Sequence, residues 1–201
     1  MNPACAHIID DDEAIRDALQ WLLKTRNVPC REWSSGEDFL AAWQEDWRGC
    51  IVLDIRMAGM SGLECFDALN ARGCALPVVF ITGHGDVPMA VSALKKGAFD
   101  FLEKPFNDLD LVDRVEKAIA FDADRQRAAA DRDTIEARLA TLTAREREVM
   151  ELILEGHYNK VIADRLSISM RTVEAHRSKI FEKMRVRSAV ELAQQLTLLR
   201  G

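Results

Sequence analysis

Acidic, hydroxyl and ammonium side chains occur where apolar segments of the chain end. Three consecutive aspartates occupy positions 10–12, and Asp54 closes the uncharged run at 50–53. Two later apolar segments end at Thr82 and just before Lys104. Neighbouring carboxylates repel unless a cation lies between them, and all-oxygen ligation suits Mg²⁺. A cation, an ammonium group and a hydroxyl around one carboxylate would form a cradle for a phosphoryl group on that carboxylate.

The segments that position these residues alternate between strand-like and helix-like patterns. Five β-α repeats of this length predict an α/β fold, a doubly wound parallel sheet of the flavodoxin-like kind with helices on both faces. In such a sheet, ligands bind beyond the carboxyl ends of the strands, near the point where the strand order reverses. The predicted strands are residues 6–10, 28–33, 50–53, 77–82 and 99–102.

Length and composition restrict the class of protein. The 201 residues allow one large domain or two small ones, and 48% hydrophobic with 30% charged residues excludes a wholly disordered chain. No apolar run approaches the ~18 residues of a membrane span, and the first nine residues lack Lys and Arg, so we expect no membrane partner and no secretory signal. Five cysteines without a C-x-x-C pair favour free thiols and a cytoplasmic location.

Charge is distributed unevenly along the chain. Residues 1–120 carry 12 Lys and Arg against 20 Asp and Glu, whereas residues 140–201 carry 11 against 8. Any surface that binds a polyanion is therefore expected in the C-terminal part, because the local field matters more than the overall net charge of −6.

The C-terminal part has a purely helical pattern. Thr143 and Glu146 predict a capping box, and Ser169 is a predicted N-cap. Two short helices joined by a tight turn within a small, basic four-helix domain indicate a helix-turn-helix.

A stretch without Gly or Pro precedes this domain. Phe121, Ala128, Ile135 and Leu142 recur every seven residues, but the companion positions include Arg125 and Arg132, so a coiled coil here would be weak. We expect a long linker helix in preference to a stable zipper. The predicted division is 1–120, a linker at 121–139, and 140–201.

Five motifs occur in a fixed order at the predicted strand ends. They are Ile9-Asp10-Asp11-Asp12-Glu13, Leu53-Asp54-Ile55-Arg56-Met57, Met60-Ser61-Gly62, Thr82-Gly83-His84-Gly85-Asp86-Val87-Pro88-Met89-Ala90 and Phe101-Leu102-Glu103-Lys104-Pro105-Phe106. In this order they resemble the receiver domain of a two-component response regulator, and the Thr-Gly-His-Gly-Asp-Val run is similar to the FixJ branch.

The resemblance implies an acceptor and a metal site. Asp54 would accept the phosphoryl group. Mg²⁺ or Mn²⁺ would be held by Asp11 directly, by Asp10 largely through water, by Asp54, and by the backbone carbonyl of Arg56.

The resemblance also implies a phosphoryl-binding and switching set. Lys104 would pair with phosphoryl oxygens, Thr82 would donate a hydrogen bond to one of them, and Phe101 would turn inward when Thr82 moves. Ala58 departs from the family, which usually has proline after Met57, so a looser loop and an altered phosphoryl lifetime are expected.

Residues 140–201 contain a second set of motifs. They are Leu142-Thr143-Ala144-Arg145-Glu146-Arg147-Glu148-Val149, Gly156, Asn159-Lys160, Ile162-Ala163, Arg171-Thr172-Val173-Glu174-Ala175-His176-Arg177, Lys179-Ile180 and Lys183-Met184. Together they resemble the LuxR-type helix-turn-helix.

The predicted recognition helix begins near Met170, and its first turns would meet base edges in the major groove. Glu174, Ala175 and Ser178 would face bases: Glu174 could accept from cytosine N4 and Ala175 could touch a thymine methyl. Arg171 lies on the same turns. Other residues are placed for phosphates, which position the protein without reading sequence: Lys160, Thr172, Arg177, Lys179 and Lys183.

These resemblances imply a transcription regulator rather than an enzyme. A sensor histidine kinase would phosphorylate Asp54, the receivers would form a homodimer, and the dimer would bind double-stranded promoter DNA and act on RNA polymerase. Whether phosphorylation acts by dimerisation, by relief of inhibition, or by both is left open.

Two alternatives compete with this interpretation. A metal-dependent phosphatase could use Asp10 as nucleophile and Asp12 as acid/base, but it would leave Asp54 and the helical C-terminal part unexplained. A receiver that controls DNA binding without phosphorylation is the second alternative, and the complete acceptor set argues against it.

Overall fold

The structure is a computed structural model that describes residues 3–83 and 87–199. The Thr-Gly-His-Gly-Asp-Val motif falls partly outside the described residues, at 84–86. The chain forms two compact units, of which the first runs to Gln126 and the second begins at Arg127.

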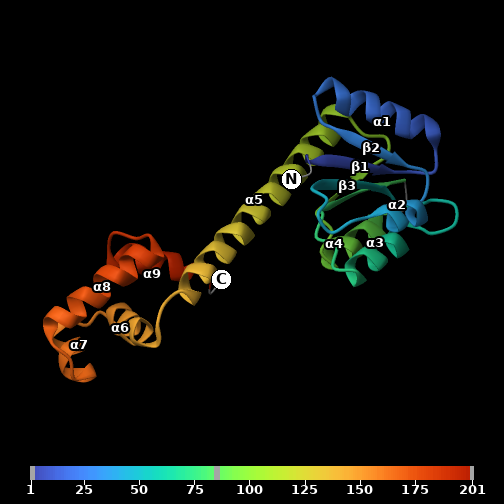
Figure 1. The fold of residues 1–201 in the computed structure, drawn as a ribbon. Coiled ribbons are helices and arrows are strands. Elements are labelled where there is room, and N and C mark those ends of the chain that lie inside the picture. Colours follow the sequence, from blue (N-terminus) through green and yellow to red (C-terminus); the bar gives the residue numbers. More distant parts are fainter. Residues whose placement is uncertain (1–2, 84–86, 200–201) are drawn as a thin grey trace. The chain divides into compact units, whose positions relative to one another are not determined.

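A five-stranded parallel sheet forms the centre of the first unit (Figure 1). Its strand order is β2-β1-β3-β4-β5, which reverses direction between β1 and β3 and confirms the predicted doubly wound fold. Every residue of β3 is buried, as expected for a central strand covered on both faces. The strands are β1 (Cys5–Ile9), β2 (Cys30–Trp33), β3 (Gly49–Asp54), β4 (Val78–Thr82) and β5 (Asp100–Glu103).

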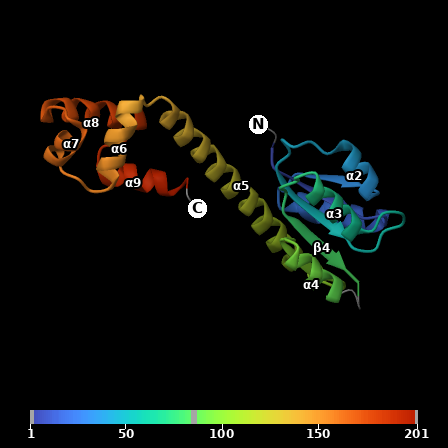
Figure 2. The ribbon, with the colours of Figure 1, turned by 90° about the horizontal axis from the view of Figure 1, so that it is seen from below.

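Helices cover both faces of this sheet (Figures 1 and 2). On one face, α1 (Glu13–Thr25) and the first turns of α5 (Asp108–Ala140) bury Leu23 and Leu111 against β1 and β4. On the other face, α2 (Gly36–Ala42), α3 (Gly62–Ala71) and α4 (Val87–Lys95) bury Phe39, Phe66 and Ala93. With both faces covered, the carboxyl ends of the parallel strands share one edge of the sheet.

The fifth helix is a single long element. It runs without interruption from Asp108 to Ala140, so the predicted linker helix continues directly from the last helix that packs on the sheet. Of the predicted heptad residues, Ile135 and Leu142 are buried in the core of the second unit, whereas Phe121 is 49% exposed. Two of the four heptad residues therefore pack inside the second unit, which favours a spacer helix over a coiled coil.

The second unit is a four-helix domain, as predicted. The capping box of Thr143 and Glu146 starts its first helix, and Ser169 caps the third. Ser167 adopts a left-handed conformation (φ 53°) and makes the tight turn of the helix-turn-helix. The helices are α6 (Ala144–Leu154), α7 (Asn159–Leu166), α8 (Met170–Met184) and α9 (Ala189–Thr197).

Two predictions from composition can be compared with the structure. All five cysteines are free thiols, which confirms the expectation drawn from their spacing. Among the described residues, none of the helices combines the length and the apolar character that crossing a membrane requires.

Candidate functional site

The sheet register brings two carboxylates together. Ile9 pairs with Leu53 across β1 and β3, so the residues that follow, Asp10 and Asp54, leave adjacent strands at the same level. Both are buried, with exposed fractions of 2% and 5%. This pair lies at the point where the strand order reverses, the place where doubly wound sheets bind ligands.

The ammonium group of Lys104 joins the two carboxylates. Its Nζ lies 2.6 Å from Oδ1 of Asp54 and 3.3 Å from Oδ2 of Asp10. The end of β5 positions it, because the backbone N–H of Lys104 donates to the Thr82 carbonyl at 2.7 Å. Three residues that are far apart in sequence therefore meet at one charged centre.

The electrostatics of this centre favour an added cation. Burial raises the pKa of the Asp54 carboxyl, the Lys104 ammonium lowers it, and the Asp10 charge raises it again, so that the net shift is upward. Burial acts to lower the pKa of Lys104, but Asp54 and Asp10 outweigh it and the net shift is upward, so the ammonium stays charged at neutral pH. One ammonium thus neutralises two buried carboxylates incompletely, and a positive ion would complete the neutralisation.

The other two aspartates of the acidic run have different partners. Oδ2 of Asp11 accepts a hydrogen bond from the backbone N–H of Ala58 at 2.8 Å. Oδ1 of Asp12 accepts from the N–H of Ala14 at 2.9 Å and caps α1. Asp12 therefore serves as a helix cap, which weakens the phosphatase alternative that requires it as acid/base.

The donor set fits a hard divalent cation in its chemistry. Asp10 and Asp54 offer carboxylate oxygens at the ends of adjacent parallel strands, and Mg²⁺ takes only a few protein carboxylates. Among the described residues, however, no three His, Cys, Asp or Glu side chains already gather in an arrangement that could hold a metal ion. One oxygen of Asp11, Oδ2, is taken up by the hydrogen bond from Ala58.

The loop after Asp54 is tied down at two points. Besides the bond from Ala58 to Asp11, the N–H of Met60 donates to Oε1 of Glu37 at 3.0 Å. A Cβ atom at Gly62 would lie 2.1 Å from the Asp54 carbonyl oxygen, so only glycine fits there. Ala58 was expected to loosen this loop. Its N–H instead makes a hydrogen bond to Asp11 that proline, which has no N–H, could not make.

The remaining predicted residues of the first unit lie around the same edge. Thr82 is fully buried at the end of β4, and its hydroxyl donates to the Gly83 carbonyl at 3.2 Å. Phe101 is half-buried on β5 and packs at the margin of the core. The backbone N–H of Arg56 donates to Oδ2 of Asp54 at 2.6 Å, which holds the carboxylate in place.

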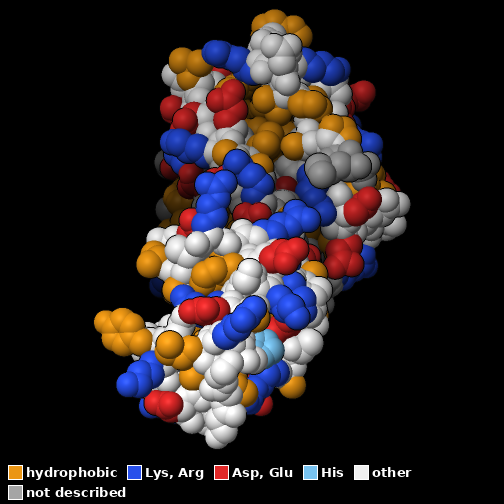
Figure 3. Space-filling model, turned by 60° about the vertical axis from the view of Figure 1, so that its left-hand side comes forward, with side chains coloured by type: hydrophobic (Ala, Val, Ile, Leu, Met, Phe, Trp, Pro, Cys, Tyr) orange, Lys and Arg blue, Asp and Glu red, His pale blue; other side chains and the backbone are white. Residues whose placement is uncertain are grey.

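In the second unit, α8 presents one polar face. Val173 and Ile180 are buried in the domain core. The helical spacing places the predicted base-facing residues Glu174, Ala175 and Ser178 together with Arg171, and all four are exposed. On the face of the molecule seen in Figure 3, basic, acidic and hydrophobic side chains are intermixed.

The predicted phosphate-contacting residues are placed in different ways. Lys160 and Lys179 are exposed, and Thr172 bonds to the hydroxyl of its neighbour Ser169 at 2.8 Å. The Arg177 guanidinium lies 5.4 Å from the centroid of the Phe181 ring.

Lys183 is placed differently from the other predicted phosphate contacts. Its ammonium donates to Oε2 of Glu146 at 2.6 Å and to the Thr141 carbonyl at 3.0 Å. These bonds tie α8 to the capping box of α6 and engage the ammonium, although a third of the side chain is exposed.

Three further residues support these sites through contacts that the sequence did not predict. Ala58 and Glu37 hold the loop after Asp54, and buried Asp122 on α5 accepts a hydrogen bond from the N–H of Gly49 at 2.9 Å. Ala58 acts through its backbone N–H, which nearly every residue type has, so its contact with Asp11 could not be predicted from the sequence. Glu146, by contrast, was already assigned to a capping box.

Comparisons with known proteins agree with this geometry. The family described as response regulator receiver domain matches residues 6–116, and the family described as bacterial regulatory proteins, luxR family, matches residues 140–196.

Individual relatives extend the similarity over nearly the whole chain. The C4-dicarboxylate transport transcriptional regulatory protein DctR of Rhodobacter capsulatus is 52% identical over 94% of this chain and 96% of its own length. The transcriptional regulatory protein FixJ of Azorhizobium caulinodans is 45% identical over 97% of this chain and 92% of its own. Among solved structures, response regulator StyR superposes with a TM-score of 0.86 at 38% identity, covering 98% of this chain and 99% of that one.

Proposed function

Because the chain belongs to the two-component response regulators that join a receiver domain to a LuxR-type DNA-binding domain, we propose that Asp54 accepts a phosphoryl group from a sensor histidine kinase and thereby controls binding to promoter DNA. We divide the chain into a receiver at 1–120, a linker at 121–139 and a DNA-binding domain at 140–201. The observation that carries the proposal is the contact of Lys104 with both Asp54 and Asp10 at the switch point of the sheet.

The chemistry proposed for the receiver is a single transfer. An Asp54 oxygen attacks the phosphorus of a phosphohistidine or a small phosphodonor, the bond from phosphorus to the leaving atom breaks, and the leaving atom keeps the electron pair. Lys104 then moves its ammonium from the carboxylate to the new phosphoryl oxygens, and the Thr82 hydroxyl turns from Gly83 to donate to one of them. Hydrolysis of the phosphoaspartate resets the protein.

A divalent cation, Mg²⁺ or Mn²⁺, would supply the charge neutralisation that brings an anionic donor to an anionic acceptor. The residues assigned to hold it are Asp10, Asp11, Asp54 and the Arg56 carbonyl. Asp11 would leave the N–H of Ala58 to take part.

The output proposed for this site is dimerisation. Recruitment of Thr82 would draw Phe101 inward and remodel the surface around Val87–Lys117, where two receivers would pair. Two DNA-binding domains would then reach half-sites about one helical turn apart, and the avidity of two weak modules would make binding depend on phosphorylation. Contact with RNA polymerase would follow from the promoter-bound dimer.

The assigned DNA contacts follow from the exposed face of α8 and the start of α7. Glu174, Ala175 and Ser178 would lie against base edges, and Arg171 would contact DNA from the same turns. Lys160, Thr172, Arg177 and Lys179 would hold phosphates. Lys183 is omitted from this set because its ammonium is bound to Glu146.

The direct test is the intact mass of the protein after incubation with Mg²⁺ and acetyl phosphate. One added phosphoryl group on the wild type, absent from Asp54→Asn, is the expected result. Asp12→Asn is the matched control, because asparagine caps a helix as well as aspartate does and this variant should be labelled like the wild type. Undiminished labelling of Asp54→Asn would exclude Asp54 as the acceptor.

A further inference from the structure

Arg16, in the first turn of α1, directs its guanidinium back to the acidic run that precedes the helix. Long side chains on a helix lean toward its amino end, so an arginine at this position can reach residues before the first turn. The Nη1 of Arg16 donates a hydrogen bond to the backbone carbonyl of Asp10 at 2.7 Å, and the side chain is half-buried. A cation thus touches the backbone of a residue that belongs to the charged centre.

The acceptor of this bond is a carbonyl although carboxylates surround it. Positions 10–13 are all acidic, and the helix dipole disfavours a cation at the amino end of a helix. In the part of the chain that the structure describes, the one side-chain hydrogen bond of Arg16 goes to the Asp10 carbonyl, and its guanidinium forms no ion pair. Arg16 therefore brings positive charge to the acidic run without occupying a carboxylate oxygen.

Bonds on every polar group hold Asp10 in place. Its N–H donates to the Trp33 carbonyl at 3.3 Å, and its Oδ1 accepts from the N–H of Asp12 at 2.9 Å. Its Oδ2 lies 3.3 Å from the Lys104 ammonium. The strand has ended before this residue, so the carbonyl has left the ladder of the sheet, and the Arg16 guanidinium satisfies it instead.

We propose that Arg16 is a positioning residue for the divalent-cation site, because it fixes the peptide unit between Asp10 and Asp11 and thereby aims both carboxylates. The proposal rests on the proposed function, which assigns these two aspartates to the cation. A rotation of this planar peptide unit changes ψ of Asp10 and φ of Asp11 together, so it would turn both side chains. The guanidinium opposes that rotation with a charge-assisted hydrogen bond to the oxygen of the same unit.

Calorimetric titration of the metal-free full chain with Mg²⁺ tests the proposal. Arg16→Met should weaken Mg²⁺ binding about threefold to tenfold, as for the loss of one net hydrogen bond. The loss of a positive charge would by itself tighten the binding of a cation, so the direction of the change separates positioning from simple electrostatics. Unchanged or tighter Mg²⁺ binding in Arg16→Met would overturn the proposal. Arg16→Gln, which also loses the guanidinium, should show the same weakening and keeps the experiment decisive if Arg16→Met does not fold.

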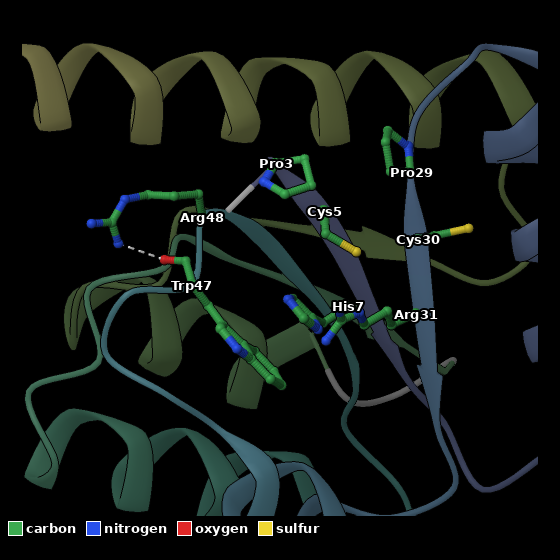
Figure 4. Close-up of a pocket in the computed structure, with 8 residues that line it drawn as sticks. All are labelled: Pro3, Cys5, His7, Pro29, Cys30, Arg31, Trp47 and Arg48. Atoms are coloured by element: carbon green, nitrogen blue, oxygen red, sulfur yellow. Dashed lines mark hydrogen bonds between the residues drawn. The ribbon is translucent and has the colours of Figure 1, made fainter. Parts of the chain in front are cut away.

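A second arginine of the same unit provides the matched control. The Arg48 guanidinium also binds backbone carbonyls, those of Trp47 at 2.8 Å and Glu45 at 3.2 Å. It lies at the amino end of β3, whereas Asp54 ends that strand, and Figure 4 shows its bond to Trp47. Arg48→Met removes the same charge and the same kind of bond, so Mg²⁺ affinity should stay within about twofold of the wild type. An equal weakening in Arg48→Met would overturn the assignment to Arg16.

Two further measurements separate positioning from a general loss of stability. In the ¹⁵N-labelled, metal-free protein, the amide signal of Asp11 belongs to the peptide unit that Arg16 binds, so it should shift in Arg16→Met and stay in place in Arg48→Met. In phosphorylation by acetyl phosphate, Arg16→Met should raise the half-saturating Mg²⁺ concentration about threefold to tenfold and leave the rate at saturating Mg²⁺ within about twofold. An unmoved Asp11 signal, or a rate that stays low at saturating Mg²⁺, would contradict a positioning role.

The wild type distinguishes a failure of this proposal from a failure of the proposed function. If the wild type takes up no Mg²⁺, the cation site itself is wrong and both proposals are overturned. If the wild type binds Mg²⁺ and Arg16→Met binds it equally well, only the role of Arg16 is overturned, and the assignment of Asp54 as acceptor stands or falls on its own labelling experiment.

Discussion

The backbone N–H of Gly49 donates a 2.9 Å hydrogen bond to Oδ2 of Asp122, which joins the first residue of β3 to a helix 73 residues further along the chain. Gly49 has a φ of 119°, and a Cβ atom there would lie 2.1 Å from the Cys5 carbonyl oxygen, so glycine is required. Asp122 is 1% exposed, and Arg125 binds its other oxygen at 3.0 Å. The strand that ends in Asp54 is thus fastened at its other end to α5.

Asp122→Ala should destabilise the first unit by about 1–3 kcal/mol, because the buried Gly49 N–H would lose its partner. All four tryptophans lie within residues 21–47, so urea unfolding followed by their fluorescence reports on this unit alone. Asp122→Asn keeps an oxygen acceptor and should lose less stability. A loss below about 0.5 kcal/mol in Asp122→Ala would show that the bond contributes little.

Ala58→Pro should tighten Mg²⁺ binding by about threefold to tenfold. Proline has no N–H, so the variant removes the hydrogen bond that Oδ2 of Asp11 accepts and frees that oxygen for the metal, and a net hydrogen bond is worth about 0.5–1.5 kcal/mol. Calorimetric titration of the unphosphorylated protein measures the change. Ala58→Val keeps the N–H and serves as the control. Weaker Mg²⁺ binding in Ala58→Pro would mean instead that the bond orients Asp11 for the metal.

The fold and the charged centre were predictable because both follow from the types of the side chains and from the periodicity of the apolar residues. A parallel sheet collects the carboxyl ends of its strands, so apolar runs that end in Asp10, Asp54 and Lys104 place those residues at one edge. The capping residues of the second unit were predictable for the same reason, since Thr143 and Ser169 act through their own side chains.

The supporting contacts were not predictable, because the donors are backbone groups or the partners are distant. The N–H of Ala58 exists in almost any residue, and only the fold brings it to Asp11. The spacing of charges along α8 likewise could not separate Lys179, which is exposed, from Lys183, which reaches the buried Glu146.

Lys179→Ala should weaken DNA binding equally for a target promoter and for a random-sequence duplex. An exposed lysine that holds one phosphate contributes through counterion release, so its loss should reduce the slope of log K against log salt by about 0.9. Fluorescence anisotropy at several salt concentrations measures both quantities. A loss confined to the target sequence would contradict a phosphate contact. Lys183→Met, which removes the same charge from the same helix, is the control and should leave the slope unchanged.

Lys183→Met should act on stability instead, and its effect should depend on pH. The Lys183 hydrogen bond lowers the pKa of the buried Glu146 carboxyl below its ordinary value of 4.5, and the Thr143 N–H lowers it further. A carboxyl that binds protons less readily when folded stabilises the fold above its unfolded pKa, and that stability is lost as the pH falls through the folded value. At pH 7 the variant should be less stable by about 1–3 kcal/mol, since Glu146 would keep a buried charge without its ammonium.

Urea unfolding of the full chain, followed by the methyl signals of the buried Val149 and Ile180, reports on the second unit. The wild type should lose its advantage over Lys183→Met as the pH is lowered below about 4.5, because protonation of Glu146 removes the ion pair that distinguishes the two proteins. A difference in stability that stays constant from neutral to acidic pH would show that Lys183 contributes by packing its aliphatic chain rather than by its charge.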